Sequence, residues 1–201
     1  MAQHTRRPRR LRGTLGALAF ILTLGVGLAA CAAGQTGISI PDRISSLTSS
    51  PESDIASVDD GYISDSDSVS IFDEQLPAIA GLDAELRQAV QDAATAAAAD
   101  GEEIRVTSGW RSAAYQQALL DEATASYGSL EEARKWVNAP ELSSHVTGDA
   151  VDIGPLDAQF WLMEHGNVYG LCQTYANERW HFELATEPGG SCPEQRLDAA
   201  G

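Results

Sequence analysis

Two histidines and one aspartate in this sequence have the residue types and the neighbours of a catalytic metal site. His145 and Asp152 lie seven positions apart in SSHVTGDAVDIG, and His181 ends the short segment ERWH. Two histidines and a carboxylate are a ligand set that zinc accepts in catalytic sites, where water fills the fourth position. Hydrolysis then requires a second carboxylate, which takes a proton from water and passes it to the leaving group. Glu178, three residues before His181, is the candidate base.

The same residues also have a plainer interpretation, because a histidine and an aspartate in a turn often only make hydrogen bonds. Each pair has an odd separation, so an uninterrupted strand would send its two members to opposite faces. Gly148 permits a sharp turn that brings His145 and Asp152 together. A bend at Asn177-Glu178 is needed to bring Glu178 beside His181.

Three segments together resemble the VanY-type D-alanyl-D-alanine carboxypeptidases, LAS-type zinc metallopeptidases that trim bacterial cell-wall peptides. SSHVTGDAVD fits the family pattern SxHxxGxAxD, ERWH fits ExWH, and SGWRSAAYQ at 108–116 is similar to SGYRSxxxQ. The three occur in the family's order. The resemblance implies zinc ligands at His145, Asp152 and His181, a general base at Glu178, and substrate binding or transition-state stabilisation by Arg111.

Four further side chains are candidates for contact with a peptide substrate. The guanidinium of Arg111 can bind a terminal carboxylate in a fork, or it can pair with one of the many acids on a solvated face. Ser143 is either a hydrogen-bonding group beside the metal or a plain turn serine. Gln116 and Trp180 either line the pocket or pack inside the domain.

The first thirty residues have the composition of an export signal. Residues 1–12 contain five arginines and no acid, and residues 13–30 carry no charge. The segment LAAC, ending at Cys31, resembles the lipobox of bacterial lipoproteins, in which the cysteine is lipidated. The alternatives are an ordinary signal peptide and an uncleaved anchor, since the apolar run is only slightly shorter than the roughly 20 residues that span a membrane. The pair Arg6-Arg7 leaves a twin-arginine route undecided.

Two cysteines remain if Cys31 carries lipid. Cys172 and Cys192 are an even number in an oxidising compartment, and we expect them to form a disulfide. The alternative is two unpaired buried thiols, because the sequence does not place their Cα atoms within bonding distance.

The charge of the mature chain limits its partners. The whole chain has 13 basic and 29 acidic residues; removal of residues 1–30 takes five arginines and no acid, which leaves 8 against 29, a net charge of −21 with neutral histidines. Such a field repels nucleic acid and anionic lipid head groups. An anionic substrate therefore needs a locally placed cation.

The elements that must position these residues follow no regular βαβ order. Residues 31–74 are rich in Ser, Asp, Gly and Thr, and we expect a disordered tether there because the segment buries too little apolar area to fold. The zinc peptidase domain is expected over 75–201. Apolar spacing and capping signals predict helices over 83–100, 112–125, 129–137 and 156–165, and strands over 104–107, 150–153, 169–175 and 179–184. The fold class is α+β, a single small domain with a central antiparallel sheet flanked by helices.

The expected function is zinc-dependent hydrolysis of the terminal D-Ala-D-Ala bond of peptidoglycan stem peptides. The expected enzyme is a monomer with no nucleic-acid partner, lipid-anchored to the outer face of the bacterial cytoplasmic membrane. One alternative is an endopeptidase that cuts within the stem peptide or crosslink, and one from another class is a non-catalytic cell-wall-binding lipoprotein. The chain also departs from larger family members, which have a longer segment before the ExWH element; this puts the substrate in doubt more than the reaction.

Overall fold

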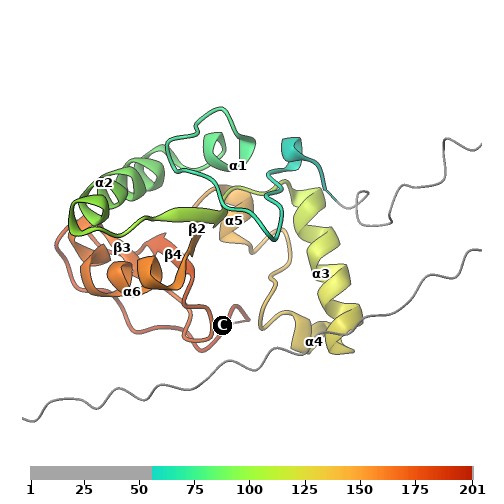
Figure 1. Cartoon of the computed structure of the whole chain (residues 1–201). Coiled ribbons are helices and arrows are strands. Elements are labelled where there is room, and N and C mark those ends of the chain that lie inside the picture. Colours follow the sequence, from blue (N-terminus) through green and yellow to red (C-terminus); the bar gives the residue numbers. More distant parts are fainter. Residues whose placement is uncertain (1–55, 201) are drawn as a thin grey trace, which may run out of the picture. The chain divides into compact units, whose positions relative to one another are not determined.

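The computed structural model describes residues 56–200, and a four-stranded sheet lies at its centre (Figure 1). The strand order across the sheet is β1 (Arg105–Ser108), β2 (Ala150–Gly154), β4 (His181–Leu184) and β3 (Leu171–Gln173). Each neighbouring pair is antiparallel. The expected α+β fold with a central antiparallel sheet is therefore confirmed.

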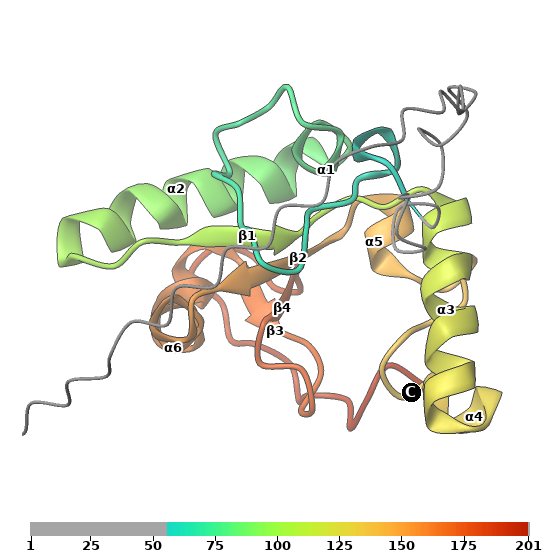
Figure 2. The same ribbon diagram turned by 45° about the vertical axis from the view of Figure 1, so that its right-hand side comes forward.

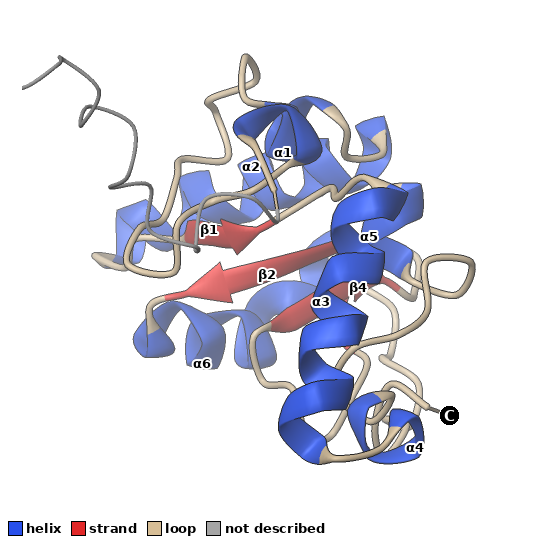
Figure 3. Ribbon diagram, turned by 90° about the vertical axis from the view of Figure 1, so that its right-hand side faces the viewer, coloured by secondary structure: helices blue, strands red, loops and turns tan. Residues whose placement is uncertain are grey.

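Helices flank this sheet on the core face and at one end. The α-helices are α1 (Pro77–Ala80), α2 (Ala84–Asp100), α3 (Ala113–Tyr127), α4 (Leu130–Ala133), α5 (Ser144–Thr147) and α6 (Leu156–His165). The described residues also contain two 3₁₀ turns, η2 (Val58–Asp60) and η3 (Gly166–Tyr169). Helices α3 and α5 gather where β1 ends and β2 begins, and α4 lies at the far end of α3 (Figures 2 and 3).

The long helices begin and end where their capping residues indicate. The Asp83 carboxylate accepts hydrogen bonds from the backbone N–H groups of Glu85 and Leu86 at the start of α2, and Gly101 ends this helix at φ +90°. Ser112 caps α3 in the same way. Helix α6 has the bounds predicted for it.

Three elements are shorter than predicted. The helix expected over 129–137 is helical only in α4, because hydrogen bonds from Lys135 and Trp136 tighten to a spacing of three residues. The strands expected over 169–175 and 179–184 shorten to β3 and β4. A 3₁₀ turn occupies the start of the first, and a turn from Glu178 to His181 occupies the start of the second.

The core lies between the sheet and helices α2 and α6. Val151 on β2 and Phe182 on β4 are cross-strand partners and are completely buried. They pack with apolar residues of the two helices, including Leu86, Val90, Ala158 and Leu162. Full burial of one such large apolar side chain contributes about 1.5–3 kcal/mol. Because side chains alternate along a strand, the residues next to Val151 and Phe182 face the other side of the sheet.

The folded part begins earlier than the predicted boundary at residue 74. Ile71 is 1% exposed in the main core, and Val69 forms a β-bridge with Val106. The Asp60 carboxylate accepts a hydrogen bond of 2.8 Å from the Ser112 hydroxyl. Residues 56–74, expected in the linker, therefore belong to the folded domain. Their apolar residues show no helical or strand periodicity, yet single ones such as Ile71 anchor the segment by packing in the core.

The expected signal peptide (1–30), Cys31 and the linker up to residue 55 lie outside the described residues. Within residues 56–200, no helix combines the length and the apolar character needed to cross a membrane.

Candidate metal centre

The pairing of β2 with β4 places two of the predicted ligands side by side. Asp152 is the direct cross-strand partner of His181, so both side chains lie on the same face of the sheet, opposite the core. The His181 Nδ1 atom is 3.3 Å from Asp152 Oδ1. Asp152 and His181 belong to different sequence motifs, and the pairing of the two strands brings them together.

The third predicted ligand reaches the same point from a single helical turn. His145 lies on α5, and its Nε2 atom is 3.4 Å from Asp152 Oδ1. Gly148 ends α5 at φ +84° and leads the chain into β2. A Cβ atom on Gly148 would lie 2.5 Å from the Gly81 carbonyl oxygen, so both the backbone angle and the close approach require glycine.

In each histidine, the ring nitrogen that points away from Asp152, here called the outer nitrogen, is held by a neighbouring oxygen. His145 Nδ1 donates to the Gly109 carbonyl at 2.8 Å, which leaves Nε2 to face Asp152. His181 Nε2 is 2.8 Å from a carboxylate oxygen of Glu183, which leaves Nδ1 to face Asp152. Metal-binding histidines are usually oriented in this way by a carbonyl or a carboxylate.

The nitrogen and oxygen atoms that face one another at the centre of the cluster fit a zinc ion. One ligand atom from each of His145, Asp152 and His181 lies within 4.8 Å of the others, and all three residues are buried. Asp152 Oδ1 and His181 Nδ1 have no hydrogen-bond partner in the described part of the chain. Buried polar atoms without partners are rare and call for a ligand. Two imidazole nitrogens and a carboxylate oxygen are donors that a catalytic zinc ion accepts.

Arg111 holds the second oxygen of the aspartate. Its Nη2 atom is 3.0 Å from Asp152 Oδ2, Nη1 donates to the Gln116 amide oxygen at 3.1 Å, and Nε donates to the Ser108 hydroxyl at 2.8 Å. The Arg111 side chain is 14% exposed, so it is not an arginine on a solvated face. Gln116 is itself buried and donates to the carbonyl of Asn138, which connects Arg111 to the segment after α4.

Glu178 lies beside the cluster with one free oxygen. Its Oε2 atom is 3.8 Å from His181 Nδ1, and its buried Oε1 has no hydrogen-bond partner among the described residues. The turn that joins them, closed by the hydrogen bond from His181 N–H to the Glu178 carbonyl, supplies the bend that the sequence required. Burial raises the pKa of Glu178 to about 7, where a general base works well at neutral pH.

The ligands differ in their affinity for protons. Burial alone would raise the pKa of Asp152, but His145, His181 and Arg111 hold it well below its ordinary value. Burial, reinforced by Arg111, lowers the pKa of His145. Burial alone would lower the pKa of His181, but the negative charges of Asp152 and Glu183 close to its ring raise it to about 9. Asp152 is therefore anionic, and His181 is the ligand that binds a proton most tightly.

Sequence reasoning missed Glu183. This residue follows His181 by two positions on β4, so strand alternation puts both on one face, and that signal could have found it. Its carboxylate contacts His181 and also accepts a hydrogen bond of 2.9 Å from the hydroxyl of Ser144, next to His145. The ring of Tyr175, also unpredicted, is 4.9 Å from the His181 ring, centroid to centroid.

A cavity of about 440 Å³ opens over the cluster. Ser143, Gln116 and Trp180, the predicted substrate contacts, all line it. Ser143 is 5% exposed and Trp180 is 37% exposed, so among these three predicted contacts Trp180 presents the largest surface to a ligand. A larger hollow of about 870 Å³, between α2 and residues 184–188, contains none of the clustered histidines or carboxylates.

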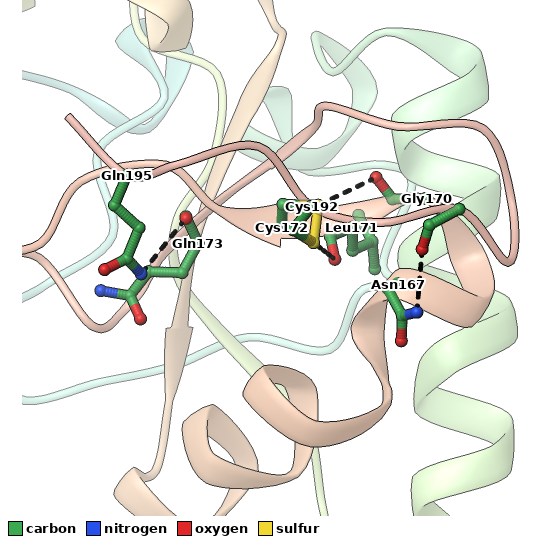
Figure 4. The surroundings of a disulfide bond; sticks show 8 residues. Asn167, Gly170, Leu171, Cys172, Gln173, Cys192 and Gln195 are labelled. Atoms are coloured by element: carbon green, nitrogen blue, oxygen red, sulfur yellow. Dashed lines mark hydrogen bonds between the residues drawn. A yellow bond between two sulfur atoms is a disulfide. The ribbon is translucent and has the colours of Figure 1, made fainter.

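A disulfide joins Cys172 on β3 to Cys192, the pairing expected from the sequence (Figure 4). The two Cα atoms are 5.7 Å apart. Beside it, the amide of Asn167 donates to the carbonyl of Gly190. The segment after β4 is thereby fixed to the strand that borders the ligand-bearing β4.

Comparison with known families agrees with this geometry. The sequence model of VanY, described as D-alanyl-D-alanine carboxypeptidase, matches residues 80–188, which is more than half of the chain. The chain belongs to the VanY family. The matched residues contain all three predicted ligands, the candidate base and Arg111.

Individual VanY relatives are similar over part of their length. A D-alanyl-D-alanine carboxypeptidase of Enterococcus faecalis is 31% identical over an alignment 157 residues long, which covers 62% of this chain and 59% of the relative. The chain thus spans about three fifths of that relative. The structure of the vancomycin-resistance D,D-pentapeptidase VanY with Zn(II) is 30% identical with a TM-score of 0.48, and covers 51% of this chain and 71% of that one. VanYB in complex with D-alanine-D-alanine gives the same identity and TM-score, over 51% and 70%.

Proposed function

We propose that this chain is a zinc-dependent D,D-carboxypeptidase that hydrolyses the terminal D-Ala-D-Ala bond of peptidoglycan stem peptides. The observation that carries the proposal is the buried group of His145, Asp152 and His181 with Glu178 3.8 Å from His181. A binding-only protein gives no reason for the free carboxylate of Glu178 beside the ligands. A structural zinc site usually has four protein ligands and favours cysteine, whereas this group has three and none is cysteine.

Glu178 moves the proton in the proposed reaction. A zinc ion held by the two histidines and Asp152 supplies Lewis-acid chemistry, which stabilises negative charge on the substrate carbonyl. The unpartnered oxygen of Glu178 accepts a proton from the attacking water and then donates it to the departing D-alanine amine. Its raised pKa of about 7 suits both steps, because the group gains and loses a proton readily near neutral pH.

Arg111 and the polar cavity wall position the substrate. A peptide that ends in D-alanine carries a carboxylate, which the acidic surface of the mature chain repels. Arg111 lines the cavity beside Asp152 and supplies the positive charge for binding that carboxylate or the charge that develops in the transition state. Ser143 and Trp180 line the same cavity as candidate contacts for the peptide. The amide of Gln116 keeps Arg111 in place.

The proposed place of action is outside the cytoplasmic membrane. The basic and apolar segments before LAAC support export and lipidation at Cys31, and residues 32–55 would then connect the lipid to the domain. A monomer on such a tether suits a polymeric substrate that lies above the membrane. A Cys31→Ser protein should lose its lipid and leave the membrane fraction, as mass spectrometry and fractionation would show; retention of both would contradict the anchor.

Mass spectrometry of digested muropeptides tests the reaction. Incubation of the zinc-loaded protein with pentapeptide-containing muropeptides should remove a single terminal alanine and leave tetrapeptides. Larger fragments would instead identify an endopeptidase that cuts within the stem peptide or crosslink. Unchanged muropeptides would support the non-catalytic binding protein.

A further inference from the structure

Two aromatic side chains line the cavity away from the metal ligands. Tyr127 ends α3, and Trp136 lies in the turn after α4; both belong to the same cavity wall as Leu119 and Asn138. Their rings are stacked, with planes 9° apart and centroids 6.3 Å apart. This Tyr127–Trp136 pair is absent from the proposed reaction, which uses only the end of the cavity nearest Asp152.

The pair is not needed to fill the core. The small apolar cluster between α3 and α4 consists of Leu120, Ala123, Ala133 and Ala139, with Val137 packed against it. Tyr127 is 51% exposed and Trp136 is 41% exposed, whereas Trp161 in the main core is 8% exposed. Two large rings that keep about half of their surface in water beside a cavity offer a flat apolar face to a ligand.

The position of the pair matches the length of a stem peptide. Gln116 contacts Arg111 at the start of α3, and Tyr127 is eleven residues further along the helix. At 1.5 Å per residue this places the two about 16 Å apart along the helix axis. Four extended residues, from the scissile bond back to the first residue of a pentapeptide, span about 13 Å. The next group along the substrate is the sugar to which stem peptides are attached.

A sugar ring also has the right chemistry for this surface. The face of an aromatic ring carries partial negative charge, which attracts the weakly positive C–H groups on one side of a pyranose. A sugar brings apolar C–H area without requiring a cation. This matters because the mature chain has a net charge of −21.

We propose that Tyr127 and Trp136 form a subsite for the sugar that carries the stem peptide. The proposal rests on the proposed function, since it places the terminal D-Ala-D-Ala at the metal centre. It makes the chain an enzyme for peptidoglycan strands or their sugar-linked precursors rather than for free peptides. Loss of one aromatic contact of this kind should weaken recognition by about 3- to 10-fold.

Matched substrates test the subsite. The same pentapeptide ending in D-Ala-D-Ala is supplied free and attached to its sugar, and the ratio of the two kcat/KM values is measured. The wild type should prefer the sugar-linked form, and Trp136→Ala and Tyr127→Ala should each lower this ratio about 3- to 10-fold. Trp136→Phe, which keeps a ring, should retain most of the ratio. Phe160→Ala is the control, because Phe160 is 48% exposed on α6 and lies outside the cavity lining.

A binding measurement separates this proposal from the proposed reaction. Calorimetry with the Glu178→Gln protein measures affinity for both substrates without cleavage, and adding Trp136→Ala to it should weaken binding of the sugar-linked form alone. A ratio that stays the same in both alanine variants would overturn the subsite. Equal losses on the two substrates would assign the pair to the peptide and overturn the sugar assignment. If the wild type cleaves neither substrate the reaction is wrong, and the calorimetry still decides the subsite.

Discussion

The chemistry of single residues depends on which atom each one turns toward the centre. The two carboxylate oxygens of Asp152 have different neighbours. Arg111 contacts Oδ2 at 3.0 Å, and Oδ1 lies beside the histidines without a hydrogen-bond partner among the described residues. In each histidine the outer nitrogen contacts a fixed oxygen, and the other ring nitrogen faces Asp152, where it can bind the metal. The ligand set is thus organised by its neighbours, and loss of such neighbours commonly costs 10–100-fold in metal affinity.

Replacement of Glu183 should weaken zinc binding without removing a ligand. Glu183→Gln removes the negative charge that orients His181 but keeps an oxygen that can accept from the Ser144 hydroxyl, so zinc affinity should fall by about 10- to 100-fold. Competition with a chromophoric chelator measures the change. Glu187→Gln is the control, because Glu187 is an exposed glutamate after the end of β4, and this variant should bind zinc like the wild type. Equal affinities in all three proteins would show that Glu183 does not position the ligand.

Zinc affinity should rise with pH because a proton and the metal compete for His181. Its pKa is raised to about 9, so at pH 7 this histidine is protonated and must release a proton when zinc binds. The pKa of His145 is lowered, so it is already neutral and releases none. Release of one proton gives about a tenfold gain in affinity per pH unit between pH 7 and 9. Calorimetry in buffers of different ionisation enthalpy counts the protons, and an affinity independent of pH would contradict this assignment.

At the scale of elements, capping signals predicted the long helices, whereas the turn α5 and the pairing of the strands depend on tertiary contacts. Asp83 and Gly101 bound α2 as expected. The single turn α5 was not predicted, since four residues give no periodicity and its end at Gly148 is fixed by contact with residues 81–83 between α1 and α2. The sequence motifs identified the ligands, but the register that pairs Asp152 with His181 is a long-range property of the sheet.

Gly148 should be sensitive to even the smallest side chain. In Gly148→Ala, the left-handed backbone angle and the clash with the Gly81 carbonyl together should cost about 3 kcal/mol or more in the free energy of unfolding, and zinc affinity should fall as His145 moves. Gly101→Ala is the matched control, because its φ of +90° is similar and no atom lies within 4 Å of the added Cβ. The control should lose only about 1–2 kcal/mol. Equal losses in urea unfolding would show that the close approach at Gly148 is unimportant.

At the scale of the whole molecule, segments before and after the sheet are both anchored to the folded domain. Residues 56–74 pack onto the domain through Ile71 and Asp60, and the disulfide ties Cys192 back to β3. The early boundary was missed because composition reports the average of a segment, whereas a few buried residues can anchor it. The disulfide was predicted from the cysteine count and the expected export signal, neither of which requires knowledge of the fold.

Removal of the disulfide should lower stability but leave the metal ligands intact. The closed loop has a sequence separation of 20 residues, and the chain-entropy model gives a loss of about 3 kcal/mol on opening a loop of this size. The double variant Cys172→Ala/Cys192→Ala should therefore unfold at lower urea concentration and still bind zinc. Loss of zinc binding in the folded double variant would show that the bridge also shapes the metal centre.

The most direct test of the central claim compares the wild type with Glu178→Gln in the same preparation. Zinc content is measured by elemental analysis, and release of D-alanine from a pentapeptide ending in D-Ala-D-Ala is measured on the same samples. We expect about one zinc per chain in both proteins, release of D-alanine by the wild type, and a rate at least a hundredfold lower in the variant. Release at the wild-type rate by the zinc-loaded variant would contradict the role of Glu178, and a wild type that binds zinc but releases no D-alanine would contradict the proposed reaction.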